Sequence, residues 1–89
     1  MVYFTKHACR RLESFQLSRG IIIEALRRPE KVFYDTLTGN FIAVKLHEAK
    51  YLIVAFNVDK DIKVITVLLT SKHNIIINRE RRGRWVRIA

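Results

Sequence analysis

The chain has 89 residues, 49% of them hydrophobic, which is enough for a single domain over residues 1–89 with its own core. One cysteine excludes an intrachain disulfide and favours the reducing cytoplasm, and no apolar stretch reaches the roughly 18 residues of a membrane span, so no membrane partner is expected. Seventeen Lys and Arg against eight Asp and Glu give a net charge of +9, which favours a polyanionic partner, nucleic acid or an acidic protein.

Two helices are predicted at the N-terminus, over residues 4–15 and 18–28. Thr5 and Ser18 are suitable N-caps, because a side-chain oxygen can accept a hydrogen bond from a free amide of the first turn. Apolar residues recur at helical spacing in both segments, at Phe4, Ala8, Leu12 and Phe15 and again at Ile21, Ile22, Ala25 and Leu26. Pro29 ends the second helix. Each helix should therefore pack one apolar face on a sheet.

From Lys31 onward the apolar period changes to two, which predicts strands at 31–37, 41–47, 51–58 and 62–70. The hairpin from Tyr51 to Thr70 is the strongest signal, since both arms are rich in β-branched and aromatic residues. Three-residue loops are predicted at all three breaks, pairing Leu37 with Phe41, His47 with Tyr51 and Val58 with Ile62. A two-residue loop after His47 is rejected, because it would pair Leu46 with Tyr51 and mix the two faces.

This register predicts one strongly apolar face under the helices and one mixed face. The helix face should include Ile42, Val44, Leu52, Val54, Val64, Thr66 and Leu68; the hydroxyl of Thr66 would need a partner there or face a site. The mixed face is too apolar to be bare, so the C-terminal segment or a second copy of the chain, as a homodimer, should cover part of it. A short helix or turn is expected around 72–82, then an extended piece after Gly83. The predicted class is α+β: two N-terminal helices on a four-stranded, or slightly larger, antiparallel meander sheet, with a basic C-terminal segment.

No metal site and no other cofactor are predicted. The histidines and Cys9 lack zinc-ligand spacing, and the chain has no phosphate loop, dinucleotide-binding turn or paired-carboxylate motif. RNA cleavage without metal needs a base for the 2′-OH, an acid for the leaving 5′ oxygen and cations for the phosphate. Histidines, tyrosines and arginines are the residue types that supply these groups.

His7 and Arg11 are the candidate catalytic residues. They lie one turn apart on the first helix and so share a face at the rim of its contact with the sheet. The helix dipole at its N-terminus favours the neutral imidazole that can act as a base, and the guanidinium can bind a phosphate with two hydrogen bonds. The alternative is that His7 only orients the first turn and Arg11 pairs with a carboxylate.

Two further groups are candidates for contact with nucleic acid. His47 and Tyr51, with Lys45, would form a platform of cations and a stacking ring on the mixed face, or else an ordinary exposed cross-strand pair. The basic tail combines guanidinium groups with an indole, or else is a solvated tail whose tryptophan fills the core. The full set of these candidates is Lys45, His47, Tyr51, Arg81, Arg82, Arg84 and Trp85.

Short motifs follow one another in a familiar order along nearly the whole chain. They are Phe4-Thr5-x-His7-Ala8-x-x-Arg11-Leu12, Ser18-Arg19-Gly20-Ile21, Tyr51-Leu52-Ile53-Val54, Lys63-Val64-Ile65-Thr66-Val67 and Gly83-Arg84-Trp85. The chain resembles small prokaryotic domains of unknown function that open with His-Ala-x-x-Arg and are related to BrnT-type toxins of the RelE/ParE-like superfamily. The resemblance implies a RelE-like fold and, for the toxin members, metal-independent RNA cleavage inhibited by a cognate antitoxin.

The predicted function is therefore that of a toxin-like RNA-interacting protein, a metal-independent endoribonuclease of a toxin–antitoxin system with an acidic antitoxin as partner. The alternative is a non-catalytic basic module that binds nucleic acid or protein, and the superfamily also has members that act on gyrase. The two classes differ in geometry. Catalysis is favoured where His7 and Arg11 meet the C-terminal arginines or His47 in one cleft.

Overall fold

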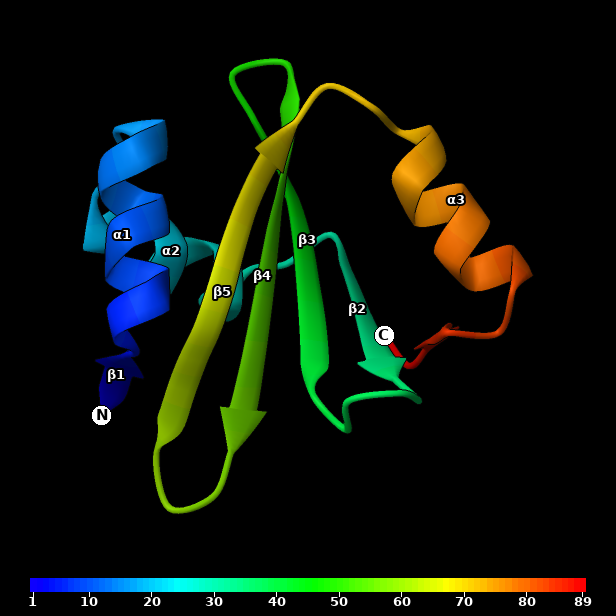
Figure 1. Ribbon diagram of the computed structural model, residues 1–89, viewed down its shortest axis with the longest axis horizontal. Coiled ribbons are helices and arrows are strands. Elements are labelled where there is room, and N and C mark those ends of the chain that lie inside the picture. Colours follow the sequence, from blue (N-terminus) through cyan, green and yellow to red (C-terminus); the bar gives the residue numbers. More distant parts are fainter.

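The computed structural model describes all residues from 1 to 89 as an α+β fold (Figure 1). In chain order the elements are β1 (Val2–Phe4), α1 (Lys6–Phe15), α2 (Arg19–Arg27), β2 (Lys31–Asp35), β3 (Phe41–His47), β4 (Lys50–Val58), β5 (Ile62–Thr70), α3 (Asn74–Arg81) and β6 (Trp85–Arg87). The strands form one sheet in the order β1-β5-β4-β3-β2-β6, in which only β1 runs parallel to its neighbour. The α+β class is confirmed, and the sheet has six strands and is mixed, whereas an antiparallel meander of four strands or slightly more was predicted. No helix is both long and apolar enough to cross a membrane.

Both predicted N-caps are confirmed. The Thr5 hydroxyl accepts a hydrogen bond from the Ala8 amide (3.0 Å), and the Ser18 hydroxyl accepts one from the Ile21 amide (3.3 Å). Each satisfies an amide that the first helical turn leaves without a partner. The first helix begins later than expected, because Phe4 belongs to β1, which pairs with β5.

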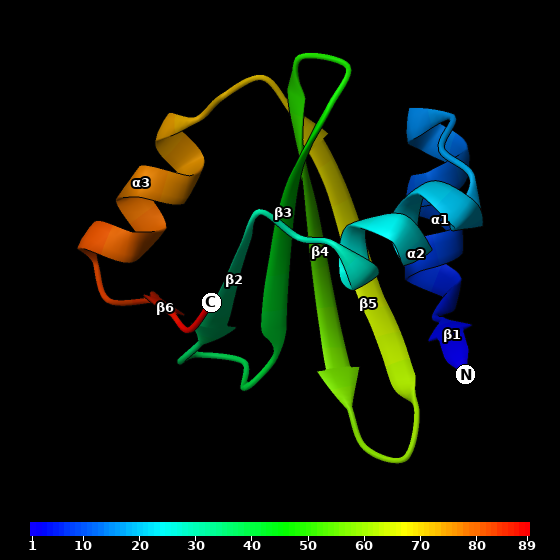
Figure 2. The same cartoon turned by 180° about the vertical axis from the view of Figure 1, so that it is seen from behind.

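The sheet separates two clusters of buried side chains. On one side α1 and α2 contribute Ala8, Leu12, Ile22 and Ala25, which pack on Ala43, Leu52, Val54, Val64 and Val67. On the other side α3 and β6 contribute Ile76 and Trp85, which pack on Phe33, Ile42, Val44, Ile53 and Ala55. Figures 1 and 2 show α1 and α2 on the opposite side of the sheet from α3. The expectation that the C-terminal segment covers the second face is confirmed.

The β3–β4 hairpin differs from the prediction. His47 pairs with Lys50 and Leu46 with Tyr51, so the loop has two residues, Glu48 and Ala49. Both have positive φ, 49° and 66°, as in a type I′ turn. The rejection of a two-residue loop was wrong, because Leu46 does pair with Tyr51 and the faces are assigned differently from the prediction. The altered register turns Ile42 and Val44 away from α1 and α2 and towards α3.

A β-bulge in β5 changes the faces a second time. Ala55 pairs with Thr66 and Phe56 with Val64, which leaves Ile65 as the extra residue. After the bulge, Val67 lies with α1 and α2, whereas Thr66 and Leu68 lie on the α3 side. The predicted faces of these residues were therefore wrong. The β4–β5 pairing of Val58 with Ile62 is confirmed, but the predicted Leu37–Phe41 pair is not, because β2 ends at Asp35 and Tyr34 pairs with Phe41.

Candidate nucleic-acid interface

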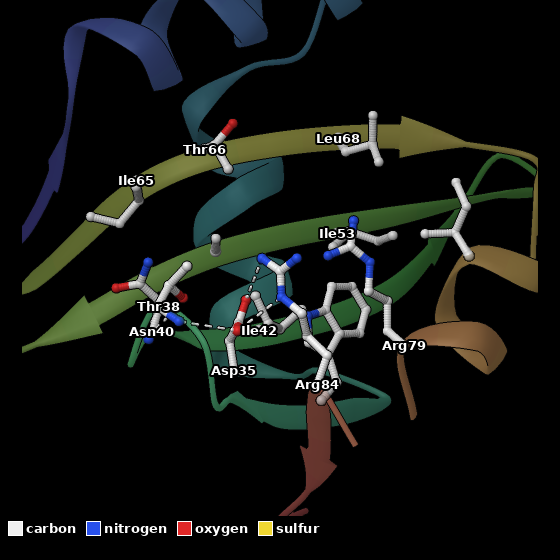
Figure 3. Close-up of a pocket in the computed structure, with 13 residues that line it drawn as sticks. Asp35, Thr38, Asn40, Ile42, Ile53, Ile65, Thr66, Leu68, Arg79 and Arg84 are labelled. Carbon is white, nitrogen blue, oxygen red and sulfur yellow. Dashed lines mark hydrogen bonds and ion pairs between the residues drawn. The ribbon is translucent and has the colours of Figure 1, made fainter. Parts of the chain in front are cut away.

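A cavity of about 310 Å³ lies between the sheet and α3. This volume is at the lower end of the range of small-molecule sites, about 300–1,000 Å³. Its apolar lining comes from β3, β4, β5, α3 and β6, and consists of Ile42, Ile53, Ala55, Ile65, Leu68, Ile75 and Trp85. Its polar lining consists of Asp35, Thr38, Asn40, Thr66, Arg79 and Arg84. The cavity therefore combines an apolar surface with a few polar groups (Figure 3).

A partly buried ion pair forms one end of the cavity. Asp35 is only 4% exposed, and its Oδ1 accepts hydrogen bonds from Arg84 Nε (3.2 Å) and from the amides of Leu37 (3.0 Å) and Thr38 (3.3 Å). Arg84 Nη2 donates to Oδ2 (3.4 Å). Burial by itself raises the pKa of Asp35, but the guanidinium and the two amides outweigh it and hold the pKa below its ordinary value. The charge of Arg84 is therefore largely neutralised within the protein.

Arg79 is the second guanidinium of the cavity. Its Cζ lies 5.6 Å from the ring centroid of Trp85, within the range of a cation–π contact, and no carboxylate lies within 4 Å of it. Figure 3 shows that Arg79 and Arg84 both reach into the cavity. Trp85 is 6% exposed, and its buried Nε1 has no hydrogen-bond partner. Trp85 is thus a core residue that also forms a wall of the cavity.

The C-terminal segment, which contributes Arg79 and Arg84 to the cavity, is strongly basic. Of the 17 Lys and Arg in the chain, only Arg28 and Arg84 lie within 4 Å of an Asp or Glu carboxylate. The segment from Ser71 to the C-terminus holds six of them, Lys72, Arg79, Arg81, Arg82, Arg84 and Arg87, with Glu80 as its one acidic residue. Arg81 and Arg82, at the end of α3, are exposed. We call this segment of α3, β6 and their connections the C-terminal basic surface.

His7 and Arg11 lie elsewhere. Both are exposed on α1, and neither makes a side-chain hydrogen bond or an ion pair. Because α1 and α3 are on opposite sides of the sheet, His7 and Arg11 do not meet the C-terminal arginines in one cleft. No group of three or more His, Cys, Asp or Glu side chains is placed to hold a metal ion.

The predicted platform of Lys45, His47 and Tyr51 is not assembled. Lys45 Nζ donates to the carbonyl oxygen of Arg28 (2.8 Å), at the C-terminus of α2, where a cation is favourable. His47 is half-buried beside α2, with its Nε2 4.0 Å from Glu48 Oε2. Tyr51 is on the other face and stacks on His73, with ring centroids 4.8 Å apart. The pairing of Tyr51 with Leu46 instead of His47 places His47 and Tyr51 on opposite faces.

The prediction of site residues included Arg84 and Trp85 but missed Asp35, Asn40 and Arg79. Asp35 and Arg84 are 49 residues apart and meet because β2 pairs with β6, which places Asp35 opposite Trp85. The one sequence signal for the β5 part of the cavity was Thr66, a hydroxyl in the middle of an apolar strand.

Comparison of the chain with protein-family models, with curated proteins and with solved structures gives no match. The relation to BrnT-type toxins therefore rests on the sequence motifs alone and stays a prediction.

Proposed function

We propose that this chain is a toxin-like RNA-interacting protein and that its C-terminal basic surface binds the RNA backbone. The observation that carries the proposal is that five of the six basic residues of this segment have no Asp or Glu partner, and that one of the five, Arg79, lines the cavity. Clustered cations repel one another, and a polyanion relieves this repulsion and releases its own counterions on binding. Arg81, Arg82 and Arg79 are the residues that we assign to phosphate contacts.

The cavity favours RNA over an acidic protein as the partner of this surface. Proteins that bind single-stranded nucleic acid combine cations for the backbone with apolar or aromatic surfaces for the bases. The surface has both parts, because Arg79 lines the apolar cavity and belongs to the same helix, α3, as the exposed Arg81. An acidic antitoxin would use the same charges, and it remains a further proposed partner.

The test is the salt dependence of binding between the protein and a fluorescent single-stranded RNA. The affinity should fall as salt rises, and the double variant Arg81→Gln/Arg82→Gln should reduce the slope of log affinity against log salt by about 2, about 1 for each phosphate contact. The control, Arg10→Gln/Lys60→Gln, removes the same charge from exposed positions on α1 and in the β4–β5 loop. Absence of binding at low salt, or equal slopes for both double variants, would contradict the proposal.

The catalytic form of this proposal is a metal-independent endoribonuclease in which His7 is the base or acid and Arg11 binds the phosphate. The separation of α1 from α3 does not favour this form, because His7 and Arg11 do not meet the C-terminal arginines in one cleft. What supports it is that both side chains are open to a substrate and that neither is engaged by another group of the protein. Incubation with a mixed RNA pool in EDTA should then give fragments that disappear in His7→Ala. Fragments that persist in the variant would exclude this role for His7. Binding without fragments, also in a translating extract, would leave the non-catalytic module.

A further inference from the structure

We infer that the cavity between the sheet and α3 receives one unpaired nucleotide of the bound RNA, with its base on the apolar sheet surface and its phosphate at Arg79. The inference rests on the proposed function and adds to it the ligand of the cavity.

The sheet side of the cavity is suited to a flat ring. Ile53 and Ala55 of β4 lie beside Ile65 and Leu68 of β5, and the last two are only half-buried, so the apolar surface is open to the cavity. The bulge contributes to this surface, because it places Ile65 and Thr66 on the same side of the sheet. A base in a duplex is stacked and paired, and it can lie on such a surface only after it has lost its partner. A base that binds in the cavity is therefore unpaired.

Some polar groups of the cavity already form hydrogen bonds within the protein, and others are free to bind a ligand. Arg84 is held by Asp35, whereas Arg79 contacts only the indole of Trp85 and keeps its donors for an anion. Asn40 Oδ1 accepts from Asn57 Nδ2 (3.3 Å), which leaves the Asn40 amide NH₂ without a partner. The Thr66 hydroxyl also makes no hydrogen bond. The guanidinium of Arg79 can bind one phosphate, and the Asn40 amide and the Thr66 hydroxyl can form hydrogen bonds with the edge of a base.

The test uses Trp85, the one tryptophan of the chain, as a fluorescent reporter in the cavity wall. The protein is titrated with the four ribonucleoside monophosphates, with single-stranded RNA, with an RNA duplex, with inorganic phosphate and with an acidic peptide. We expect a saturable change with at least one mononucleotide and with single-stranded RNA, weaker binding of the duplex, and no saturable change with phosphate or peptide. Competition by the mononucleotide separates a nucleotide site from contact of the RNA with a distant surface.

Two variants alter the cavity in different ways. Arg79→Gln removes its free cation, and Thr66→Leu adds bulk to the sheet surface without loss of a protein hydrogen bond. Arg79→Gln should weaken mononucleotide binding about tenfold, the effect of one lost charge-assisted hydrogen bond. Thr66→Leu should also weaken it, because the larger side chain occupies the surface on which the base would lie. Arg10→Gln is the matched control, because it removes the same charge from the exposed face of α1 and should leave the affinity unchanged. Urea unfolding of each variant verifies the fold, and Arg79→Gln keeps the test decisive where Thr66→Leu is unstable.

The outcomes separate the two levels of proposal. RNA binding that is unaffected by both cavity variants and by mononucleotides would overturn the inference and leave the proposed function standing. Equal affinity for duplex RNA, or a saturable Trp85 signal with the acidic peptide in place of nucleotides, would also overturn the inference. Absence of RNA binding by the unaltered protein would instead remove the proposed function.

Discussion

The hydroxyl of Thr5 donates a hydrogen bond to the carbonyl oxygen of Ile65 (2.9 Å) while it accepts one from the Ala8 amide. Ile65 is the extra residue of the bulge in β5, so its carbonyl group lies outside the regular pairing with β4. One side chain thus begins α1 and stabilises the bulge that turns Thr66 towards the cavity. The N-terminal helix and the cavity lie on opposite sides of the sheet and are linked through this contact.

Substitution of Thr5 by Ala should lower the free energy of unfolding by about 2 kcal/mol. About 1 kcal/mol comes from the lost N-cap and about 1 kcal/mol from the lost bond to Ile65. Urea unfolding followed by circular dichroism measures the difference. Thr5→Ser keeps a hydroxyl at the same position and should recover most of the stability, and an equally large loss in both variants would contradict the role of the hydroxyl.

Asp35 predicts a loss of stability in acid. Because hydrogen bonds hold the folded-state pKa of Asp35 below its ordinary value, the contribution of its carboxylate is present above a pH of about 4 and is lost as the pH falls through the folded-state pKa. Asp35→Asn should be less stable by about 2 kcal/mol at neutral pH, since it removes the charge of a buried carboxylate that pairs with the partly exposed Arg84 and accepts two backbone hydrogen bonds. The difference from the unaltered protein should narrow below pH 4. Unfolding curves from pH 2 to 7 would reveal a constant difference if Asp35 were not involved.

The turn between β3 and β4 predicts a gain of stability. Glu48 and Ala49 both have positive φ, a conformation that costs residues other than Gly and Asn about 1 kcal/mol each. The double variant Glu48→Asn/Ala49→Gly should therefore raise the free energy of unfolding by about 1 kcal/mol after the entropy of glycine is included. The thermal midpoint should rise by about 4–8 °C. The thermal midpoint of the variant with the reversed order, Glu48→Gly/Ala49→Asn, can be compared with that of Glu48→Asn/Ala49→Gly. A fall in the midpoint of Glu48→Asn/Ala49→Gly would contradict the type I′ geometry.

The three consecutive isoleucines of α3, residues 75–77, should contribute unequally to stability, because only one of them is fully buried against the sheet. Ile76 is 1% exposed in the core, whereas Ile77 is 39% exposed on the outside of the helix. Ile76→Ala should cost about 2–4 kcal/mol, because it removes buried methyl groups and leaves a cavity, and Ile77→Ala should change the stability by less than about 0.5 kcal/mol. Ile75→Ala should mainly enlarge the cavity between the sheet and α3, because Ile75 is one of its lining residues. Similar losses at Ile76 and Ile77 would show that α3 does not pack as described.

The local elements follow from residues close together in the chain. The N-caps at Thr5 and Ser18, the end of the second helix before Pro29 and the β4–β5 hairpin were all predicted, because hydrogen bonds to neighbouring amides and hydrophobic periodicity decide them. The edge strand β1 was not predicted. Val, Tyr and Phe favour strands, but a run of three is too short to be distinguished from the start of the helix that follows, and its pairing with β5, about 60 residues away, decides its conformation.

Which residues lie on which face of the sheet could be determined only from the tertiary structure. A strand presents alternate residues to each side, so a difference of one residue in a loop or a bulge exchanges the two faces. Here the turn at Glu48 and Ala49 lacks the usual Gly or Asn, and Ile65 looks like any other strand residue. Neither feature had a signal in the sequence. The turn is set by the pairing of β3 with β4, and the bulge has a hydrogen bond from Thr5, 60 residues away, to the carbonyl group of Ile65.

The composition alone predicted a basic protein with a candidate polyanion partner, because the excess of Lys and Arg is a property of the chain itself. Which arginines gather, and around what, was decided by folding. The antiparallel pairing of β2 with β6 brings Asp35 to Arg84 and closes one end of the cavity, while α1 holds His7 and Arg11 on the far side of the sheet. Charge is additive along a sequence, but a site requires side chains from distant segments at fixed distances, and only the packing of those segments determines that.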